Sequence, residues 1–354
     1  MIPMNVIINK INFIKCLYEI KKEDIGKDIQ IINNIGKYKY TIQNEEIEKE
    51  IKVIIKGEIK SNILKYKFNE IGDHIIYLIS YNDLTNSSCM FRNCSLLKKI
   101  NFSSFNTSKV TDMSYMFRDC SSLKELNLSS FDTSKVTDMY SMFRDCSSLK
   151  ELNLSSFDTS NAKDMIYMFN GCSLLEKLNI SSFNTSQVIY MSYMFNNCSS
   201  LKELNLLSFD TSKVINMDKM FRGCSSLTEL NLSSFNTSQL VDMSFMFDNC
   251  FSLTELNIFS FNTEKVTNMS HMFNKCFSLK ELNLSSFNTN QVMDMSNMFS
   301  GCSSLKELDL SSFNTNHLTK CVNIFDSINK TCKIKCKDKQ ILKEFKNSNG
   351  CIVI

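Results

Sequence analysis

The sequence predicts a mixed α/β repeat fold, a right-handed solenoid of parallel strands and short helices, preceded by a small β-rich, sandwich-like domain. Three observations support this fold class: a strict repeat, strand and helix signals inside each repeat, and a non-repeating β-rich start. The repeat cysteine recurs every 26 residues, without insertion or deletion, at Cys94, Cys120, Cys146, Cys172, Cys198, Cys224, Cys250, Cys276 and Cys302. A strict period of this kind indicates a solenoid, in which each unit buries its apolar side against its neighbours.

Each repeat contains one short strand signal. Leu152 and Leu154 alternate with Asn153 and Ser155, a pattern typical of a strand with one buried face. We therefore expect parallel strands at 125–128, at 151–154 and every 26 residues thereafter. Neighbouring strands should lie about 4.8 Å apart, and the crossovers between them should be right-handed.

A helix signal follows the strand in each repeat. Val136, Met139, Met142 and Phe143 stand at i, i+3, i+6 and i+7, which is one apolar face of a two-turn helix over 136–143. The slot before each cysteine holds Asn, Asp or Gly in eight of nine repeats, and Lys275 in the other. These residues tolerate a left-handed backbone, so the slot predicts the point where the helix stops.

The repeat phrase MFxxCSSLKELNLSSFNTSKVTDMS resembles the repeat of the BspA-like leucine-rich repeat proteins of bacteria and protists. The resemblance covers about two-thirds of the chain and is carried by the Met-Phe, Cys, Leu-x-Leu, Phe-Asn/Asp-Thr and Val-x-x-Met slots. It implies a leucine-rich-repeat solenoid, often surface-exposed, used for adhesion or interaction and without known catalysis. Cys321 fills a Met slot in the last repeat, a departure that fits a terminal, capping unit.

The repeats divide the chain into three parts: a β-rich domain or cap at 1–83, the array at 84–325 and a C-terminal cap at 326–354. Short strand-like runs occupy 13–20, 28–32, 37–43, 47–55, 63–68 and 74–79. This first part either covers the exposed edge of the first repeat, which we favour, or acts as a docking module. In the last part, a strand at 332–337 and a helix at 339–346 should cap the solenoid.

Composition and charge exclude several classes of partner. The formal net charge is +3 over 354 residues and no basic stripe with interleaved aromatics occurs, so no nucleic-acid partner is expected. No run approaches 18 apolar residues, so no membrane span is expected. The first residues lack a basic start, and polar residues interrupt their apolar run, so no signal peptide is expected. The resemblance implies the cell surface or secretion; a cytoplasmic location stays open.

Nothing in the sequence indicates an enzyme or a metal site. The cysteine column should be buried and reduced, because a cysteine that recurs among apolar neighbours behaves as a small hydrophobe. Cys332 and Cys336 have no histidine nearby to complete a zinc site. An active site needs different catalytic groups gathered at one place, whereas His74, His271 and His317 occupy unrelated positions of the repeat. We expect no catalytic residues, no cofactor and no metal.

The outward strand positions are the candidate binding surface. They form rows, Asn127, Asn153, Asn179, Asn205, Asn231, Asn257 and Asn283 beside several serines. Such rows are either a ladder that hydrogen-bonds along the stack, which we favour, or a flat face for a repetitive ligand such as a glycan or ice.

Four residues depart from the repeat toward exposed apolar area, and they are the candidate partner-binding residues. Phe251, Phe277, Phe259 and Leu207 each replace the usual Ser of their slot. They either mark a partner site or reflect sequence drift in the array. The function predicted is a non-catalytic interaction or adhesion solenoid with a protein or glycan partner; the alternative is an intracellular structural scaffold.

Overall fold

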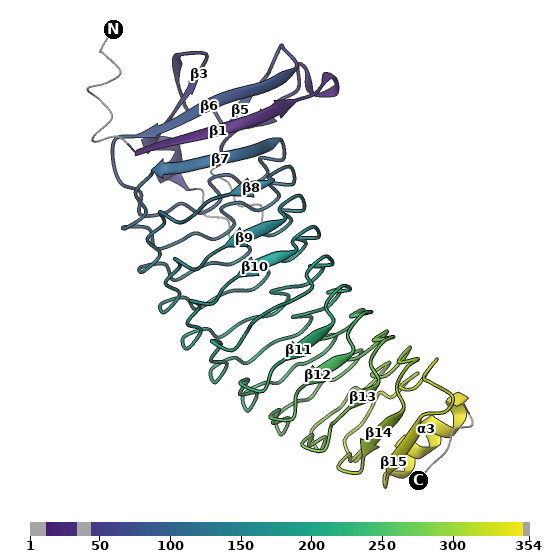
Figure 1. Cartoon of the computed structure of the whole chain (residues 1–354). Coiled ribbons are helices and arrows are strands. Elements are labelled where there is room, and N and C mark those ends of the chain that lie inside the picture. The colour runs from purple at the N-terminus through teal and green to yellow at the C-terminus, as the bar shows by residue number, and fades with distance from the viewer. Residues whose placement is uncertain (1–11, 34–43, 350–354) are drawn as a thin grey trace. The chain divides into compact units, whose positions relative to one another are not determined.

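The computed structural model describes residues 12–33 and 44–349 and divides them into two compact units (Figure 1). The first unit runs to Ala162 and includes Gly171–Ser182, and the second contains Lys163–Asn170 and everything from Phe183 onward. Both units are stacks of the same 26-residue rung, so the repeats form a β-solenoid.

The first unit begins with a six-stranded sheet. In order across the sheet its strands are β4 (Glu58–Ser61), β3 (Ile51–Ile55), β6 (Gly72–Ser80), β1 (Asn12–Ile20), β7 (Leu97–Ser104) and β8 (Glu125–Leu126). The short elements beside it are η1 (Lys22–Asp24), β2 (Ile29–Gln30), α2 (Glu45–Glu50) and β5 (Lys65–Tyr66). All neighbours in the six-stranded sheet are antiparallel except β7 and β8, which are parallel because both belong to repeats.

The N-terminal strands extend the strand row of the array, and the sandwich-like arrangement expected for them is not confirmed. β1 pairs antiparallel with β7, the strand of the first repeat, and Cys16 lies opposite Ile100. An open strand edge would otherwise present unpaired backbone groups. This pairing covers the strand edge of the first rung.

The structure differs from the expected N-terminal runs in two places. The run at 47–55 is split between α2 and β3, because the Asn44 side chain accepts a hydrogen bond from the Ile47 backbone N–H (3.3 Å) and begins a helix. β4 lies between the runs at 47–55 and 63–68 and was not predicted. The run predicted at 37–43 lies outside the described residues.

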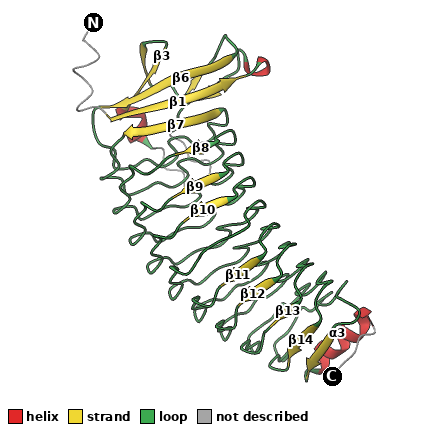
Figure 2. Ribbon diagram, viewed as in Figure 1, coloured by secondary structure: helices red, strands yellow, loops and turns green. Residues whose placement is uncertain are grey.

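Parallel strands recur through both units, as predicted. They are β9 (Glu151–Asn153) and β10 (Lys177–Asn179) in the first unit, and β11 (Glu229–Asn231), β12 (Glu255–Asn257), β13 (Glu281–Leu282), β14 (Glu307–Leu310) and β15 (Lys333–Cys336) in the second. Equivalent residues pair in register, Leu178 with Leu152 and Leu256 with Leu230. Most strands are shorter than the four residues expected, and loops and turns make up most of each rung (Figure 2).

The short helices predicted inside the repeats are wrong: the segment at 136–143 is a series of tight turns, and its equivalents are too. Ser141 and Asp145 both have a left-handed backbone, with φ of 55° and 59°, and this interrupts a helix. The N–H of Met142 bonds to Met139 O within its rung (3.2 Å), whereas the N–H of Phe117 bonds to Met142 O of the next rung (2.9 Å). Hydrogen bonds between rungs thus replace those of a helix. The left-handed slot before the cysteine is confirmed, even at Lys275, where φ is 58°.

The core of each rung is built from its Met, Phe, Leu and Cys columns. Phe221 stacks between Phe195 and Phe247, with ring centroids 5.7 Å away on each side. The Cys224 thiol donates a hydrogen bond to Phe195 O at 3.1 Å, and the same contact recurs in other rungs. All nine column cysteines are buried free thiols, as predicted.

The C-terminal cap of the second unit is also as predicted. β15 pairs in parallel with β14, and α3 (Lys339–Asn349) follows it. The Asp338 side chain accepts hydrogen bonds from the backbone N–H groups of Gln340 (2.9 Å) and Ile341 (3.1 Å) at the start of this helix. The Phe345 ring packs edge-on against Phe325 at 5.1 Å, so α3 covers the end of the aromatic column.

Candidate partner-binding face

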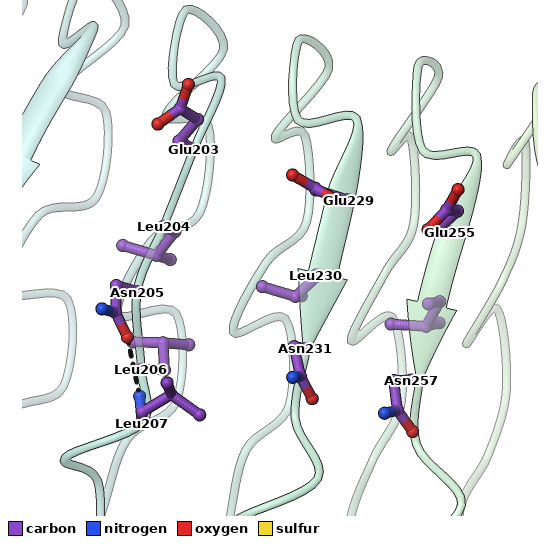
Figure 3. Close-up of a pocket in the computed structure, with 11 residues that line it drawn as sticks. Glu203, Leu204, Asn205, Leu206, Leu207, Glu229, Leu230, Asn231, Glu255 and Asn257 are labelled. Atoms are coloured by element: carbon purple, nitrogen blue, oxygen red, sulfur yellow. Dashed lines mark hydrogen bonds between the residues drawn. The ribbon is translucent and has the colours of Figure 1, made fainter.

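The outward strand positions of the second unit line a groove with a volume of about 610 Å³ (Figure 3). It spans three successive rungs: a segment at 203–207, then β11 and β12. Figure 3 shows Glu203, Glu229 and Glu255 in one row and Asn205, Asn231 and Asn257 in another. The groove therefore offers the same two polar side chains three times, at intervals of one rung.

Leucines form the apolar part of the groove. The segment at 203–206 is not in a strand ladder, unlike its equivalents in the neighbouring rungs, and Leu204 is half-buried where Leu230 is fully buried. Leu207, one of the four candidate residues, lines the groove and is 63% exposed. An exposed leucine beside half-buried ones provides apolar surface that a partner can cover.

The asparagine row does not form the ladder along the stack that the sequence suggested. Asn205 Oδ1 accepts the backbone N–H of Leu207 at 3.1 Å (dashed in Figure 3), and Asn231 Oδ1 accepts that of Ser233 at 3.1 Å. Each of these side chains thus closes a turn in its own rung. Within the described residues the amide nitrogens of Asn205, Asn231 and Asn257 have no acceptor, so they are available to a ligand.

The carboxylates of this groove have no cationic partner. Among the described residues, no lysine or arginine nitrogen lies within 4.0 Å of the carboxylates of Glu203, Glu229 or Glu255. In the first unit the equivalent positions form ion pairs, Lys99 with Glu125 and Lys177 with Glu151. The hydrogen bond from Lys99 lowers the pKa of Glu125, and the hydrogen bond to Glu151 raises the pKa of Lys177.

The structure separates the four candidate residues. Phe251 and Phe277 stack on each other with ring centroids 5.2 Å apart and are 39% and 41% exposed. They precede the strands of their rungs. Phe259 follows β12, is 60% exposed and occupies the slot that Leu207 occupies two rungs earlier, but it does not line the groove. Only Leu207 belongs to the groove, and only Phe251 and Phe277 contact each other.

A second column of left-handed residues was not recognised in the sequence. Tyr193, Lys219, Phe245 and His271 occupy it with φ between 57° and 60°, a conformation that costs an ordinary side chain roughly 1–2 kcal/mol. Lys219 Nζ lies 4.6 Å from the Tyr193 ring centroid and 5.0 Å from that of Phe245, and Phe245 stacks on His271 at 4.3 Å. Burial lowers the pKa of His271. His271 is therefore half-buried in a stack of side chains from neighbouring rungs.

The described part of the chain contains neither a cluster of metal-ligating side chains nor a membrane-spanning helix. No three His, Cys, Asp or Glu side chains gather there in a way that could hold a metal ion. None of the helices seen in 12–33 and 44–349 has the length and apolar character needed to cross a membrane.

The repeats match the family model described as "Mycoplasma protein of unknown function, DUF285". The matched segments are 66–177, 149–255, 175–276 and 250–335, which overlap and include every rung of the array. The chain belongs to the DUF285 family. The groove lies within the matched segment 175–276, so it is part of the DUF285 repeats and not of the caps.

Three solved structures are similar to this DUF285 chain at low identity. A leucine-rich cell surface protein from Faecalibacterium prausnitzii A2-165 is 16% identical, with a TM-score of 0.32, over 73% of this chain and 77% of that one. A chain of the TLR13–ssRNA13 complex is 17% identical (TM-score 0.31; 66% of this chain, 39% of that one). The pneumococcal vaccine antigen PcpA is 15% identical (TM-score 0.27; 71% and 75%). No curated protein matches the sequence. Family membership rests on the repeats alone.

Proposed function

We propose that this chain is a non-catalytic interaction protein that binds a protein or glycan partner through the strand face of its repeats. The groove of the second unit carries the proposal, because it combines exposed apolar surface with amide donors that have no acceptor, and carboxylates that have no cationic partner, among the described residues. Polar groups left free beside apolar surface are what a ligand site needs in order to fix orientation and gain affinity. The resemblance to BspA-like surface proteins agrees with an adhesive role.

The repeated character of the face argues for binding and against catalysis. The same Glu and Asn positions recur rung after rung, so a partner can contact several equivalent groups in sequence. Multiple weak contacts of this kind raise affinity without any one strong site. A catalytic centre would instead require unlike groups placed together once.

The test is a binding screen with two variants of matched charge. The purified chain is applied to a glycan array and to immobilised surface proteins of the source cell. Asn231→Lys places a bulky cation in the groove, whereas Gln291→Lys places the same cation at an exposed position outside it. Loss of a bound partner in the first variant alone supports the proposal, and retention of the partner in both variants refutes a strand-face site.

The scaffold alternative is tested by location. A protease added to intact source cells degrades the chain if the chain is displayed outside, and leaves it whole if the chain works inside. Degradation at the same rate as a known surface protein supports adhesion; full protection until lysis favours the intracellular scaffold.

A further inference from the structure

The strand faces of the two units carry different charge. In the first unit the strand-face groove is lined by four lysines and two glutamates, Lys99, Lys124, Lys150, Lys177, Glu125 and Glu151. The groove of the second unit is lined by three glutamates, Glu203, Glu229 and Glu255, and by no lysine or arginine. Since the whole chain has a formal charge of +3, this acidic groove is a local feature and does not follow from the composition.

Two of the three rungs of the groove lack a lysine that the repeat usually carries. Thr228 and Thr254 stand beside Glu229 and Glu255, in a slot that holds lysine in most other rungs, including Lys202 beside Glu203. The Thr254 hydroxyl donates to Thr228 O at 3.0 Å, so this pair is linked across the two rungs. The groove therefore differs from that of the first unit in charge and, through Leu207, in exposed apolar surface.

We propose that the groove of the second unit binds an extended, basic segment of another protein, with lysine or arginine at alternate positions. This inference rests on the proposed function and names its partner class. Lys and Arg have an apolar stem and a charged head. The stems would lie on the leucines, Leu204 and Leu207 among them, while the heads would reach the glutamate row.

The spacing of the glutamates suits an extended chain that crosses the rungs. Neighbouring rungs lie about 4.8 Å apart, so Glu203 and Glu255 are separated by roughly 10 Å. An extended peptide advances about 3.3 Å per residue and presents alternate side chains on one face about 6.6 Å apart. Two basic residues at i and i+2 can therefore share three carboxylates, and the three amide nitrogens of the asparagine row can donate to the peptide carbonyls.

The probe is a fluorescent, terminally blocked hexapeptide of alternating Lys and Thr, with Glu–Thr and Gln–Thr peptides as controls. Binding to the full chain is measured by fluorescence anisotropy at low and at physiological salt. We expect binding of the Lys–Thr peptide alone, weakening with salt because the contacts are exposed ion pairs. Absence of binding by the Lys–Thr peptide, or equal binding of the Gln–Thr peptide, would overturn the proposal.

Two triple variants with the same change in net charge locate the site. Glu203→Gln, Glu229→Gln and Glu255→Gln together should weaken binding at least about tenfold, because three ion pairs are lost at once. The control removes three carboxylates outside the glutamate row of the second unit, Glu264→Gln, Asp326→Asn and Glu344→Gln, and should change affinity less than about twofold. Equal weakening in both would mean general attraction to acidic protein and would refute the groove.

Restoring the repeat consensus gives an independent variant that should fold. Thr228→Lys with Thr254→Lys returns the lysines found in other rungs, places two cations beside the groove and should weaken binding of the Lys–Thr peptide by charge repulsion. Unchanged binding would refute the proposal. A glycan or acidic ligand that still binds the strand face in the screen above would leave the proposed function standing while this inference fails.

Discussion

Thiol reactivity provides a direct test of the rung structure, because the chain holds buried cysteines and a control cysteine in the same molecule. The column cysteines have no exposed surface, and burial raises the pKa of Cys94, Cys172, Cys224 and Cys302 from 9.0 to about 12. Cys321, in the last repeat, is partly exposed. Only the thiolate attacks an alkylating reagent, so the two classes should react at very different rates.

The magnitude follows from the pKa. A rise from 9.0 to about 12 lowers the thiolate fraction at neutral pH about 1000-fold, since each pKa unit is a factor of ten. The hydrogen bond from the Cys224 thiol to Phe195 O holds the sulfur inside the rung and further limits access. We therefore expect Cys321 to be alkylated at least about 1000 times faster than the column.

The assay is a time course with iodoacetamide at neutral pH, followed by alkylation of the remaining thiols with an isotopically heavy reagent in denaturant. Peptide mapping assigns each site and separates Cys351, which lies outside the described residues. Full labelling of the column in guanidinium is the control for reagent competence. Labelling of the column within tenfold of Cys321 in native buffer, or disulfides between adjacent rungs, would refute the buried, reduced column.

Four further predictions concern stability. Lys275→Gly should raise the unfolding free energy by about 1 kcal/mol, because its φ of 58° favours glycine; a lower melting temperature would contradict this. Phe221→Ala should lower it by about 3–5 kcal/mol, because the ring is buried between two others; a loss below about 1 kcal/mol in denaturant titration would mean that the column is not packed as described. Phe251→Ser with Phe277→Ser should change the unfolding free energy by only about 0.5 kcal/mol, since serine fills this slot in the other rungs. A large drop in melting temperature would mean that the two rings belong to the core. Hydrogen bonds from Ser311, together with Lys335, lower the pKa of Asp309 to about 2. The Asp309 carboxylate therefore contributes to the unfolding free energy above its ordinary pKa, and this contribution is lost as pH falls toward 2. Asp309→Asn should make the unfolding free energy fall less steeply at acid pH, and an unchanged acid dependence would exclude this contribution.

The sequence predicted the rung and its core because both follow from periodicity. Columns of Met, Phe, Leu and Cys at a fixed spacing can be buried only by stacking equivalent residues, which is what Phe195 and Phe221 do. The left-handed slot before the cysteine was predicted for a similar reason, since a short list of residues tolerates that backbone. The C-terminal strand and helix were predicted from local pattern alone.

The tertiary structure decided how backbone hydrogen bonds are shared between rungs. The pattern over Val136 to Phe143 fits a helix locally, but donors such as the Phe117 N–H bond to the next rung, and a one-dimensional pattern does not record that competition. The sequence pattern also did not show which partner Asn205 takes: its side chain closes a turn in its own rung and does not bond to the next one.

The candidate site was likewise only partly determined by sequence. Substitutions from Ser identified Leu207 and the phenylalanines, but their slots did not show that Phe251 contacts Phe277 while Leu207 lines a groove. The segment at 203–206 also lies outside the strand ladder of its neighbours, although its sequence is nearly the same as theirs. Identical residues can take different hydrogen-bond partners because each rung's conformation is set jointly with the rungs on either side, and that coupling exists only in the folded stack.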